Sequence, residues 1–149
     1  MTRTLLLLVH IGAVGAWLGA NLVQLVLTPR FAKGHRDVAK AWTEATVMLG
    51  ERYYNVAGAL IAISGVLLVL DGDWAWSAGF IAVGITVVVV GGIMGVTVFA
   101  PVSRRRIAAL EAGDDAAAAA TLRTIIPAAL FDTALVLLAV LAMVHKWQA

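Results

Sequence analysis

A long stretch without a charged residue, residues 5–27, places the strongest limit on what this chain can fold into. A helix of about 20 apolar residues crosses the hydrocarbon core of a bilayer. Comparable apolar stretches follow later in the chain, so we expect four transmembrane spans at about 4–27, 53–71, 76–100 and 125–146. The fold class predicted for residues 1–149 is therefore a single all-α integral membrane domain, an antiparallel bundle of four transmembrane helices.

The boundaries of the spans follow from prolines and charges. Pro29 and Pro101 are expected to end the first and third spans, because proline lacks the N–H that continues a helix. The second span is expected to begin early, through the amphipathic residues 38–54. Residues 104–120, rich in arginine and alanine, are predicted to form a short interfacial helix between spans three and four.

The composition supports a membrane protein and excludes several functions. Hydrophobic residues make up 62% of the chain and charged residues 13%. A soluble domain has about 25% charged residues. Cysteine is absent, which excludes disulfides, thiolate catalysis, iron–sulfur ligation and cysteine-type zinc sites, and no metal site is assigned from the composition. The net charge of +2 reflects arginines that flank the membrane, and it predicts the lipid bilayer and no nucleic acid as a partner.

The distribution of cations predicts the orientation. Of the 11 lysines and arginines, all except Arg3 and Lys146 lie between the first and second or between the third and fourth apolar stretches, or flank them. The positive-inside rule then places both of these connections in the cytoplasm and both termini outside. We therefore expect a multi-pass protein of the bacterial cytoplasmic (inner) membrane, N-out and C-out.

Polar residues of the first span form a stripe. At about 100° per residue, His10, Trp17, Asn21 and Gln24 lie within about 60° of one another around the helix. Polar groups in membrane helices usually face protein or a cavity. The stripe can therefore line a polar cavity or form hydrogen bonds between helices, and the sequence leaves both interpretations open.

His10 is the histidine inside this stripe, and it is a candidate haem or metal ligand or proton relay. The alternative is a histidine hydrogen-bonded to a neighbouring helix. Met143 and His145, near the end of the fourth span, are expected at a similar depth and could supply a second ligand to a haem. For His145, which stands beside Lys146 and Trp147, an interfacial anchor is the preferred interpretation.

Asp132 is the only acid inside an apolar span, and such a carboxylate must be protonated, paired or hydrated. Arg52 is expected within about one helical turn of the same depth, which predicts an interhelical ion pair. The alternative is a carboxylate that handles protons or ions, with Tyr53, Tyr54 and Asn55 as polar neighbours.

Two glycine pairs suggest how helices pack. Gly15 and Gly19, and Gly91 and Gly95, have the four-residue spacing that lets helix backbones approach closely in membranes. Such contacts could lie inside the bundle, or join the chain to another copy in a homo-oligomer or to a partner membrane protein.

A set of residues spread over most of the chain carries a resemblance to a known family. In order, they are His10, Trp17 and Gly19, then Pro29-Arg30-Phe31, Arg52-Tyr53 and Gly65, and an ending from Met143 to Lys146. The chain resembles a family of small bacterial integral membrane proteins of unknown function, which is distantly similar to the copper-resistance protein CopD and to HemJ-type protoporphyrinogen oxidases. The HemJ resemblance implies a haem b held by His10 and oxidation of a porphyrinogen. The CopD resemblance implies copper handling.

Two features limit these implications. Residues 76–100 contain no histidine, and Ala32-Lys33 stands where HemJ-like chains tend to have a Tyr-His pair, so a second haem ligand would come from the fourth span or another chain. Three functions are therefore expected, in this order: an accessory or structural membrane subunit, a haem-binding redox protein centred on His10, and a small oligomeric channel or carrier that uses Asp132 and the stripe.

Overall fold

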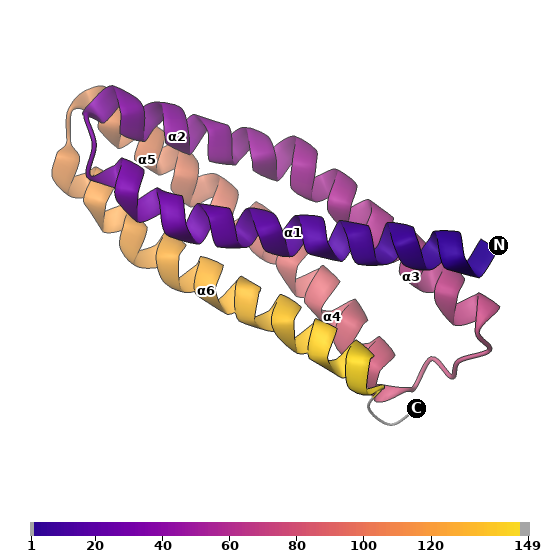
Figure 1. The fold of residues 1–149 in the computed structure, drawn as a ribbon. Helices are drawn as coiled ribbons and strands as arrows, with labels where there is room; N and C mark the ends of the chain where they lie inside the picture. The colour runs from indigo at the N-terminus through magenta and orange to yellow at the C-terminus, as the bar shows by residue number, and fades with distance from the viewer. Residues whose placement is uncertain (1, 147–149) are drawn as a thin grey trace.

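The computed structural model describes residues 2–146, which contain helices and no strand. Four long helices follow one another along the chain (Figure 1). The elements are α1 (Thr2–Ala32), α2 (Arg36–Met48), the π-helical segment η1 (Leu49–Tyr54), α3 (Asn55–Asp71), α4 (Gly79–Met94), the π-helical segment η2 (Gly95–Phe99), α5 (Ala100–Ala112) and α6 (Asp115–His145). Because α2, η1 and α3 are continuous, as are α4, η2 and α5, the predicted four-helix architecture is confirmed.

The four helices have 31, 36, 34 and 31 residues, and each is long and apolar enough to cross a membrane. At about 1.5 Å per residue they are about 46–54 Å long, against about 30 Å of bilayer hydrocarbon. Each helix is therefore longer than the hydrocarbon is thick, which leaves room for charged residues at helical positions such as Arg36 and Arg104.

Neither proline ends its helix where the sequence predicted. α1 continues through Pro29 to Ala32, and the third helix continues through Pro101 to Ala112. Pro101 closely follows η2, where the helix widens to π turns. We attribute the continuity at Pro101 to this widening, since it accommodates the proline ring and its missing N–H without ending the helix.

The predicted interfacial helix also differs in detail. Residues 104–120 are helical except for a break at Gly113 and Asp114. Gly113 has a φ of 76°, which ends α5, and the Asp114 carboxylate caps α6 by accepting a hydrogen bond of 2.8 Å from the Ala117 N–H. These residues are thus the ends of two long helices and not a separate element, because a glycine and a capping aspartate place the turn in the middle of the segment.

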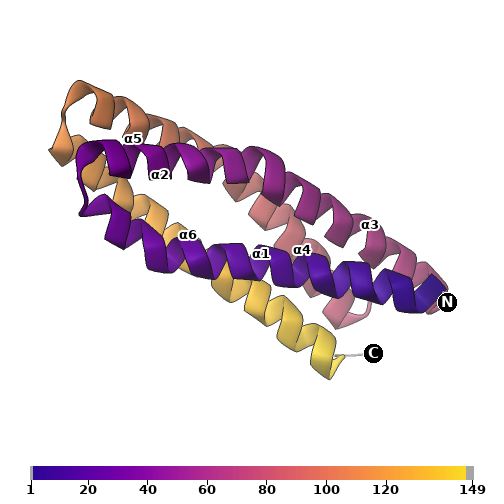
Figure 2. The same cartoon turned by 45° about the horizontal axis from the view of Figure 1, so that its top comes forward.

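The two short turns after α1 and α5 lie at the same end of the bundle, which we call the basic end (Figures 1 and 2). The connection between α3 and α4 lies at the opposite end, together with the N-terminus of α1 and the end of α6. There the helices diverge as two pairs, α1 with α3 and α4 with α6, in both views. This divergence decides which of the predicted ligands can meet.

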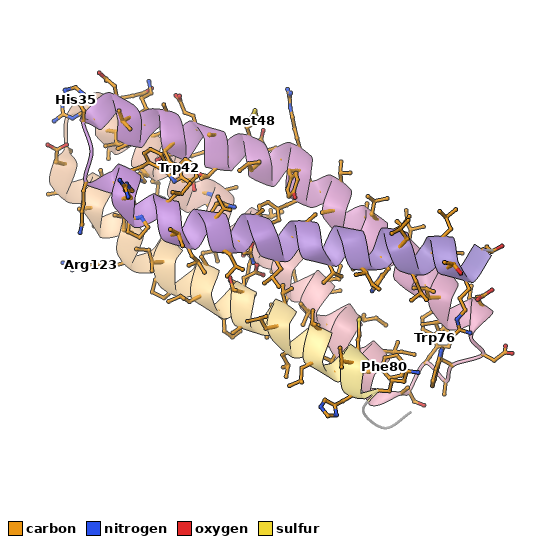
Figure 3. All side chains as sticks on the ribbon, viewed as in Figure 1. His35, Trp42, Met48, Trp76, Phe80 and Arg123 are labelled. Atoms are coloured by element: carbon orange, nitrogen blue, oxygen red, sulfur yellow. The ribbon has the colours of Figure 1, made fainter. Side chains whose placement is uncertain are left out.

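Side chains show the inside-out pattern expected for a membrane bundle. Large apolar residues point outward, with Leu8, Val26 and Val96 exposed by 68%, 71% and 77%. Figure 3 likewise shows Met48 pointing away from α2, whereas Trp42 lies between α2 and α1. The interior is built around Trp17, in a cluster with Ala13, Ala57, Ile61, Val87, Val136 and Ala139.

Ion pairs join the helices at the basic end. Arg36 contacts Asp115 at 2.9 Å, Lys40 contacts Glu111 at 2.8 Å, and Arg104 contacts Glu51 at 3.2 Å. The side chains in these three pairs are partly or largely exposed. Exposed pairs of this kind contribute little to the stability of a fold, because water and salt screen the two charges. They contribute mainly to the pairing of the second long helix with α5 and α6.

One of the four paired glycines forms a close contact inside the bundle. A Cβ at Gly91 would lie 2.9 Å from Trp17 Cζ2 and 3.2 Å from an oxygen of Asp132, whereas Gly15, Gly19 and Gly95 have no such neighbour within 4 Å. The helix contact expected at these glycines therefore occurs at Gly91.

Replacing Gly91 with alanine should destabilise the protein by about 1–3 kcal/mol, because an added methyl group overpacks a filled interior. The buried Trp17 cannot move away from that methyl group. Gly92→Ala is the matched control, since no atom lies within 4 Å of its added Cβ. Unfolding in detergent with increasing SDS, followed by circular dichroism, measures both variants. Equal stability of the two would contradict the packing described here.

Candidate functional site

The carboxylate of Asp132 is the centre of a buried polar network between α1 and α6. Asp132 is 4% exposed. Its Oδ2 atom accepts a hydrogen bond of 3.2 Å from Trp17 Nε1 and one of 2.7 Å from Asn21 Nδ2. Because both donors belong to α1, this single oxygen joins α1 to α6.

The network continues to the second long helix through Tyr54. The Tyr54 hydroxyl donates to Asn21 Oδ1 at 2.7 Å and accepts from Gln24 Nε2 at 2.6 Å. The Tyr54 ring also meets the Trp17 ring edge to face, with centroids 5.3 Å apart. The chain of donors therefore runs from Gln24 through Tyr54 and Asn21 and ends on the Asp132 carboxylate.

The other oxygen of Asp132 has no partner. Oδ1 is buried and is the one such side-chain atom without a hydrogen bond among residues 2–146. An ionised carboxylate needs a donor at this position, and a protonated one carries an O–H that needs an acceptor. In either state the described residues leave one hydrogen bond of Asp132 unmade, which costs about 1–3 kcal/mol in a buried site.

Asp132 borders a cavity of about 640 Å³, which we call the inner cavity. The cavity runs from Asp132 toward the basic end, and residues of both π-helical segments line it, including Gly50 and Tyr54 of η1 and Gly95 and Phe99 of η2. π-helical turns are frequent at functional sites, where they displace side chains from regular helical positions. The inner cavity combines aromatic walls with a few charged groups, as small-molecule sites do.

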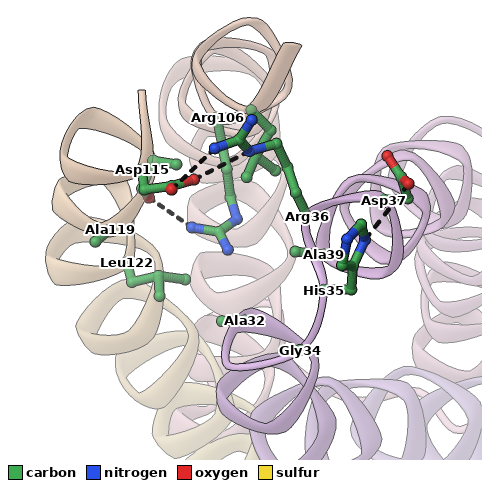
Figure 4. A pocket seen from close by; sticks show the side chains of 12 residues that line it. Ala32, Gly34, His35, Arg36, Asp37, Ala39, Arg106, Asp115, Ala119 and Leu122 are labelled. Atoms are coloured by element: carbon green, nitrogen blue, oxygen red, sulfur yellow. Dashed lines mark hydrogen bonds and ion pairs between the residues drawn. The ribbon is translucent and has the colours of Figure 1, made fainter. Parts of the chain in front are cut away.

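A second cavity, the outer cavity, lies at the basic end and has a volume of about 540 Å³ (Figure 4). The beginnings of α2 and α6 line it, with Arg36 and Asp115 among its polar residues. His35, from the turn before α2, lines it as well, and Arg106 of α5 lines both cavities.

The predicted stripe on α1 faces the interior. His10, Trp17 and Asn21 are buried and Gln24 is half-buried. Trp17, Asn21 and Gln24 both form interhelical hydrogen bonds and line the inner cavity, so the two interpretations of the stripe are compatible. His10 lies nearer the N-terminus and lines neither cavity.

His10 contacts α3 and not the Asp132 network. Its Nδ1 lies 3.0 Å from Ser64 Oγ, and the Ser64 hydroxyl itself donates to the Leu60 carbonyl. Since a hydroxyl has one hydrogen, Ser64 must accept from His10, which leaves Nε2 of a neutral ring as the unprotonated nitrogen. A hydrogen bond from the other ring nitrogen is also what metal-ligating histidines have.

The other predicted haem ligands do not join His10. His10 belongs to the α1–α3 pair, whereas Met143 contacts Gly84 of α4 and His145 is exposed at the end of α6. These helix pairs diverge at this end (Figures 1 and 2). The structure therefore shows His10 and Met143 against different helices and no contact that brings Met143 or His145 to His10, and the described residues include no cluster of three or more metal-binding side chains.

The predicted ion pair between Arg52 and Asp132 is wrong. Arg52 is exposed, and no ion pair within residues 2–146 involves either residue. Depth in the membrane was the basis of the prediction, but Arg52 lies in η1, where the extra residue of a π turn rotates side chains around the axis. Tyr54, two residues later, reaches the network instead.

Two of the buried polar residues that the sequence does not single out are Ser64 and Arg106. Ser64 is an isolated serine in an apolar stretch, with no pattern to mark it. Arg106 belongs to a run of three arginines, but its spacing to Ser103 and Leu110, which are also buried, is that of one helical face. The helical spacing of Ser103, Arg106 and Leu110 is therefore the sequence signal that points to a buried Arg106.

No protein-family model, no curated protein and no solved structure matches the chain.

Tyr54→Phe should lower the free energy of unfolding by about 1–2 kcal/mol, the usual effect of losing buried hydrogen bonds between helices. The change removes the acceptor of Gln24 and the donor to Asn21. Tyr53→Phe is the matched control, since its exposed hydroxyl makes one hydrogen bond, to the Ala16 carbonyl. SDS titration of the detergent-solubilised variants measures the difference. A Tyr54→Phe variant as stable as Tyr53→Phe would show that the network adds nothing to stability.

Proposed function

We propose that this protein is a membrane carrier or binding protein that holds a small amphipathic amine in the inner cavity, with Asp132 as its anchor. The observation that carries the proposal is the unpartnered Oδ1 of Asp132, a buried carboxylate oxygen beside a cavity of about 640 Å³. An N–H donor of a ligand would complete the hydrogen bonds of this carboxylate.

The cavity walls suit a ligand with an apolar body. Trp17 donates to Asp132 and packs against Tyr54, and Trp42 and Phe99 line the cavity farther toward the basic end. Aromatic faces attract cations, and their interaction with an amine strengthens when water is excluded. At the Asp132 end of the cavity a protonated amine therefore matches both the carboxylate and the aromatic walls, whereas an anion would meet the free carboxylate oxygen. The cations Arg104 and Arg106 line the cavity as well, but they belong to α5 at the basic end.

Asp132 also offers a route for exchange. A carboxylate that binds either a proton or an ammonium group in one place can release one when it takes up the other, which is the basis of proton-coupled carriers. The four helices of one chain are few for alternating access, so a carrier of this kind would work as a homo-oligomer.

An accessory or structural subunit is the second candidate, and a specific observation favours it. The network joins α1, η1 and α6 through hydrogen bonds whose lengths lie between 2.6 Å and 3.2 Å. A network whose purpose is to fix helix packing would have this arrangement, and it would need no ligand.

Asp132→Asn separates the two functions. The side-chain amide can keep the acceptor for Trp17 and Asn21 through its oxygen, while its NH₂ group replaces Oδ1 and removes the negative charge. We expect the affinity for ethidium, a fluorescent aromatic cation with amino groups, to fall at least about tenfold, equivalent to about 1.4 kcal/mol. Fluorescence anisotropy of the detergent-solubilised protein measures binding, and proteoliposomes with a pH gradient measure transport.

Asp71→Asn is the matched control, because Asp71 is an exposed carboxylate at the end of α3 and lies outside both cavities. Wild-type protein that binds no ethidium, or Asp132→Asn protein that binds it equally well, would refute the amine site. A structural subunit predicts a different result. Asp132→Asn would leave the free energy of unfolding unchanged, Asp132→Leu would lower it, and neither variant would change the flux of ethidium into proteoliposomes.

A further inference from the structure

Arg106 is a buried cation that holds three helices together at the basic end. It is 4% exposed and lies on α5. Its Nη1 donates to the Ala118 carbonyl and, at 3.4 Å, to Thr121 Oγ1, both on α6. Its Nε donates to Thr43 Oγ1 of α2 at 3.3 Å.

None of these partners carries a negative charge. No carboxylate among residues 2–146 lies within 4.0 Å of the Arg106 guanidinium, whereas the less buried cations Arg36, Lys40 and Arg104 each have at least one. Buried charges in proteins are normally paired, because an unpaired charge loses its hydration without compensation. The charge of Arg106 therefore lacks the partner that its burial requires.

The acid that shares the outer cavity with Arg106 is already bound. Asp115 lines this cavity, but Arg36 holds its carboxylate through two hydrogen bonds, from Nε at 3.2 Å and from Nη2 at 2.9 Å. Figure 4 shows the Arg106 guanidinium inside the cavity, beside this pair. Asp115 therefore neutralises Arg36 and not Arg106.

The guanidinium also has a free donor. Its Nη2 makes no hydrogen bond with the described residues. Small side chains, Ala39 of α2 and Ala118 and Ala119 of α6, form part of the walls of the cavity of about 540 Å³ around it. The planar fork of arginine matches the oxygen geometry of phosphate and carboxylate groups.

We propose that Arg106 and the outer cavity form a binding site for a phosphate group. The group is either free inorganic phosphate or the headgroup of an anionic phospholipid, since both present the same oxygens to the guanidinium. Arg106 lines both cavities, but the phosphate site does not depend on the amine site at Asp132, because it uses another side chain of the opposite charge and the walls of the outer cavity.

The first arm of the test uses inorganic phosphate and the full chain in an uncharged detergent. Phosphate should raise the thermal unfolding midpoint of the wild-type protein more than chloride does at equal ionic strength. Arg106→Gln should weaken the apparent phosphate binding at least about tenfold, as expected when a charge-assisted hydrogen bond is lost. Arg105→Gln, which removes the same charge from the adjacent exposed position, should retain the full response.

The second arm identifies the source of the phosphate group. Native mass spectrometry of protein taken from vesicles of phosphatidylglycerol and phosphatidylcholine counts the lipids retained. Preferential retention of phosphatidylglycerol that is lost in Arg106→Gln, without a response to inorganic phosphate, assigns the site to lipid headgroups. The reverse pattern assigns it to a free anion.

Phosphate also stabilises proteins without binding to a specific site, but such an effect would be equal in the wild type and in both variants. An equal response of all three, together with no preference for phosphatidylglycerol, overturns the proposal. If Arg106→Gln does not fold, Arg106→Lys replaces it, because it keeps the charge but loses the fork and should bind phosphate more weakly than Arg105→Lys. A wild-type protein that responds in neither arm refutes the site without any variant.

Discussion

The interior of this protein depends on the two hydrogen bonds that Asp132 Oδ2 accepts from donors on α1. In a bilayer, lipid is as apolar as the helix surfaces, so helices associate through close packing and hydrogen bonds and not through the hydrophobic effect. Trp17 and Asn21 donate to one oxygen of α6, and Tyr54 adds the second long helix. The position of Trp17 then requires Gly91 on the facing helix, because any side chain there would meet the indole ring.

This arrangement has a consequence for function, because the network that joins the helices is also incomplete. Oδ1 of Asp132 and the charge of Arg106 are both buried without a matching partner among the described residues, and they lie on the two cavities. The two groups have opposite charges and lie at different levels of the bundle, since Asp132 belongs to α6 and Arg106 of α5 contacts α6 at Ala118. At about 1.5 Å per residue, Ala118 lies about 20 Å along the helix from Asp132. Two chemically different ligands are therefore a simpler assignment than one.

Most of the fold could be predicted from the sequence because apolar length is a property of each segment. The helix ends were less predictable: Pro29 and Pro101 were expected as stops, yet the helices continue through them, aided at Pro101 by a π-helical segment that no local pattern had indicated. At the candidate site, the inward face of α1 was predictable from the spacing of Trp17 and Asn21. The partner of Asp132 was not, since depth alone favoured Arg52.

By itself the sequence determined that the chain forms four apolar helices, that His10, Trp17, Asn21 and Gln24 share one face, and that Asp132 is an acid in an apolar environment. These are local facts of helical periodicity and of transfer from water to hydrocarbon. Only the tertiary structure decided which residues meet. The direction in which a side chain points from the helix axis changes by about 100° per residue, and the π turn at η1 shifts it further. Residues at equal depth on two helices can therefore face opposite sides. For that reason Tyr54 and not Arg52 joins the network, and His10 pairs with Ser64 and not with Met143 or His145.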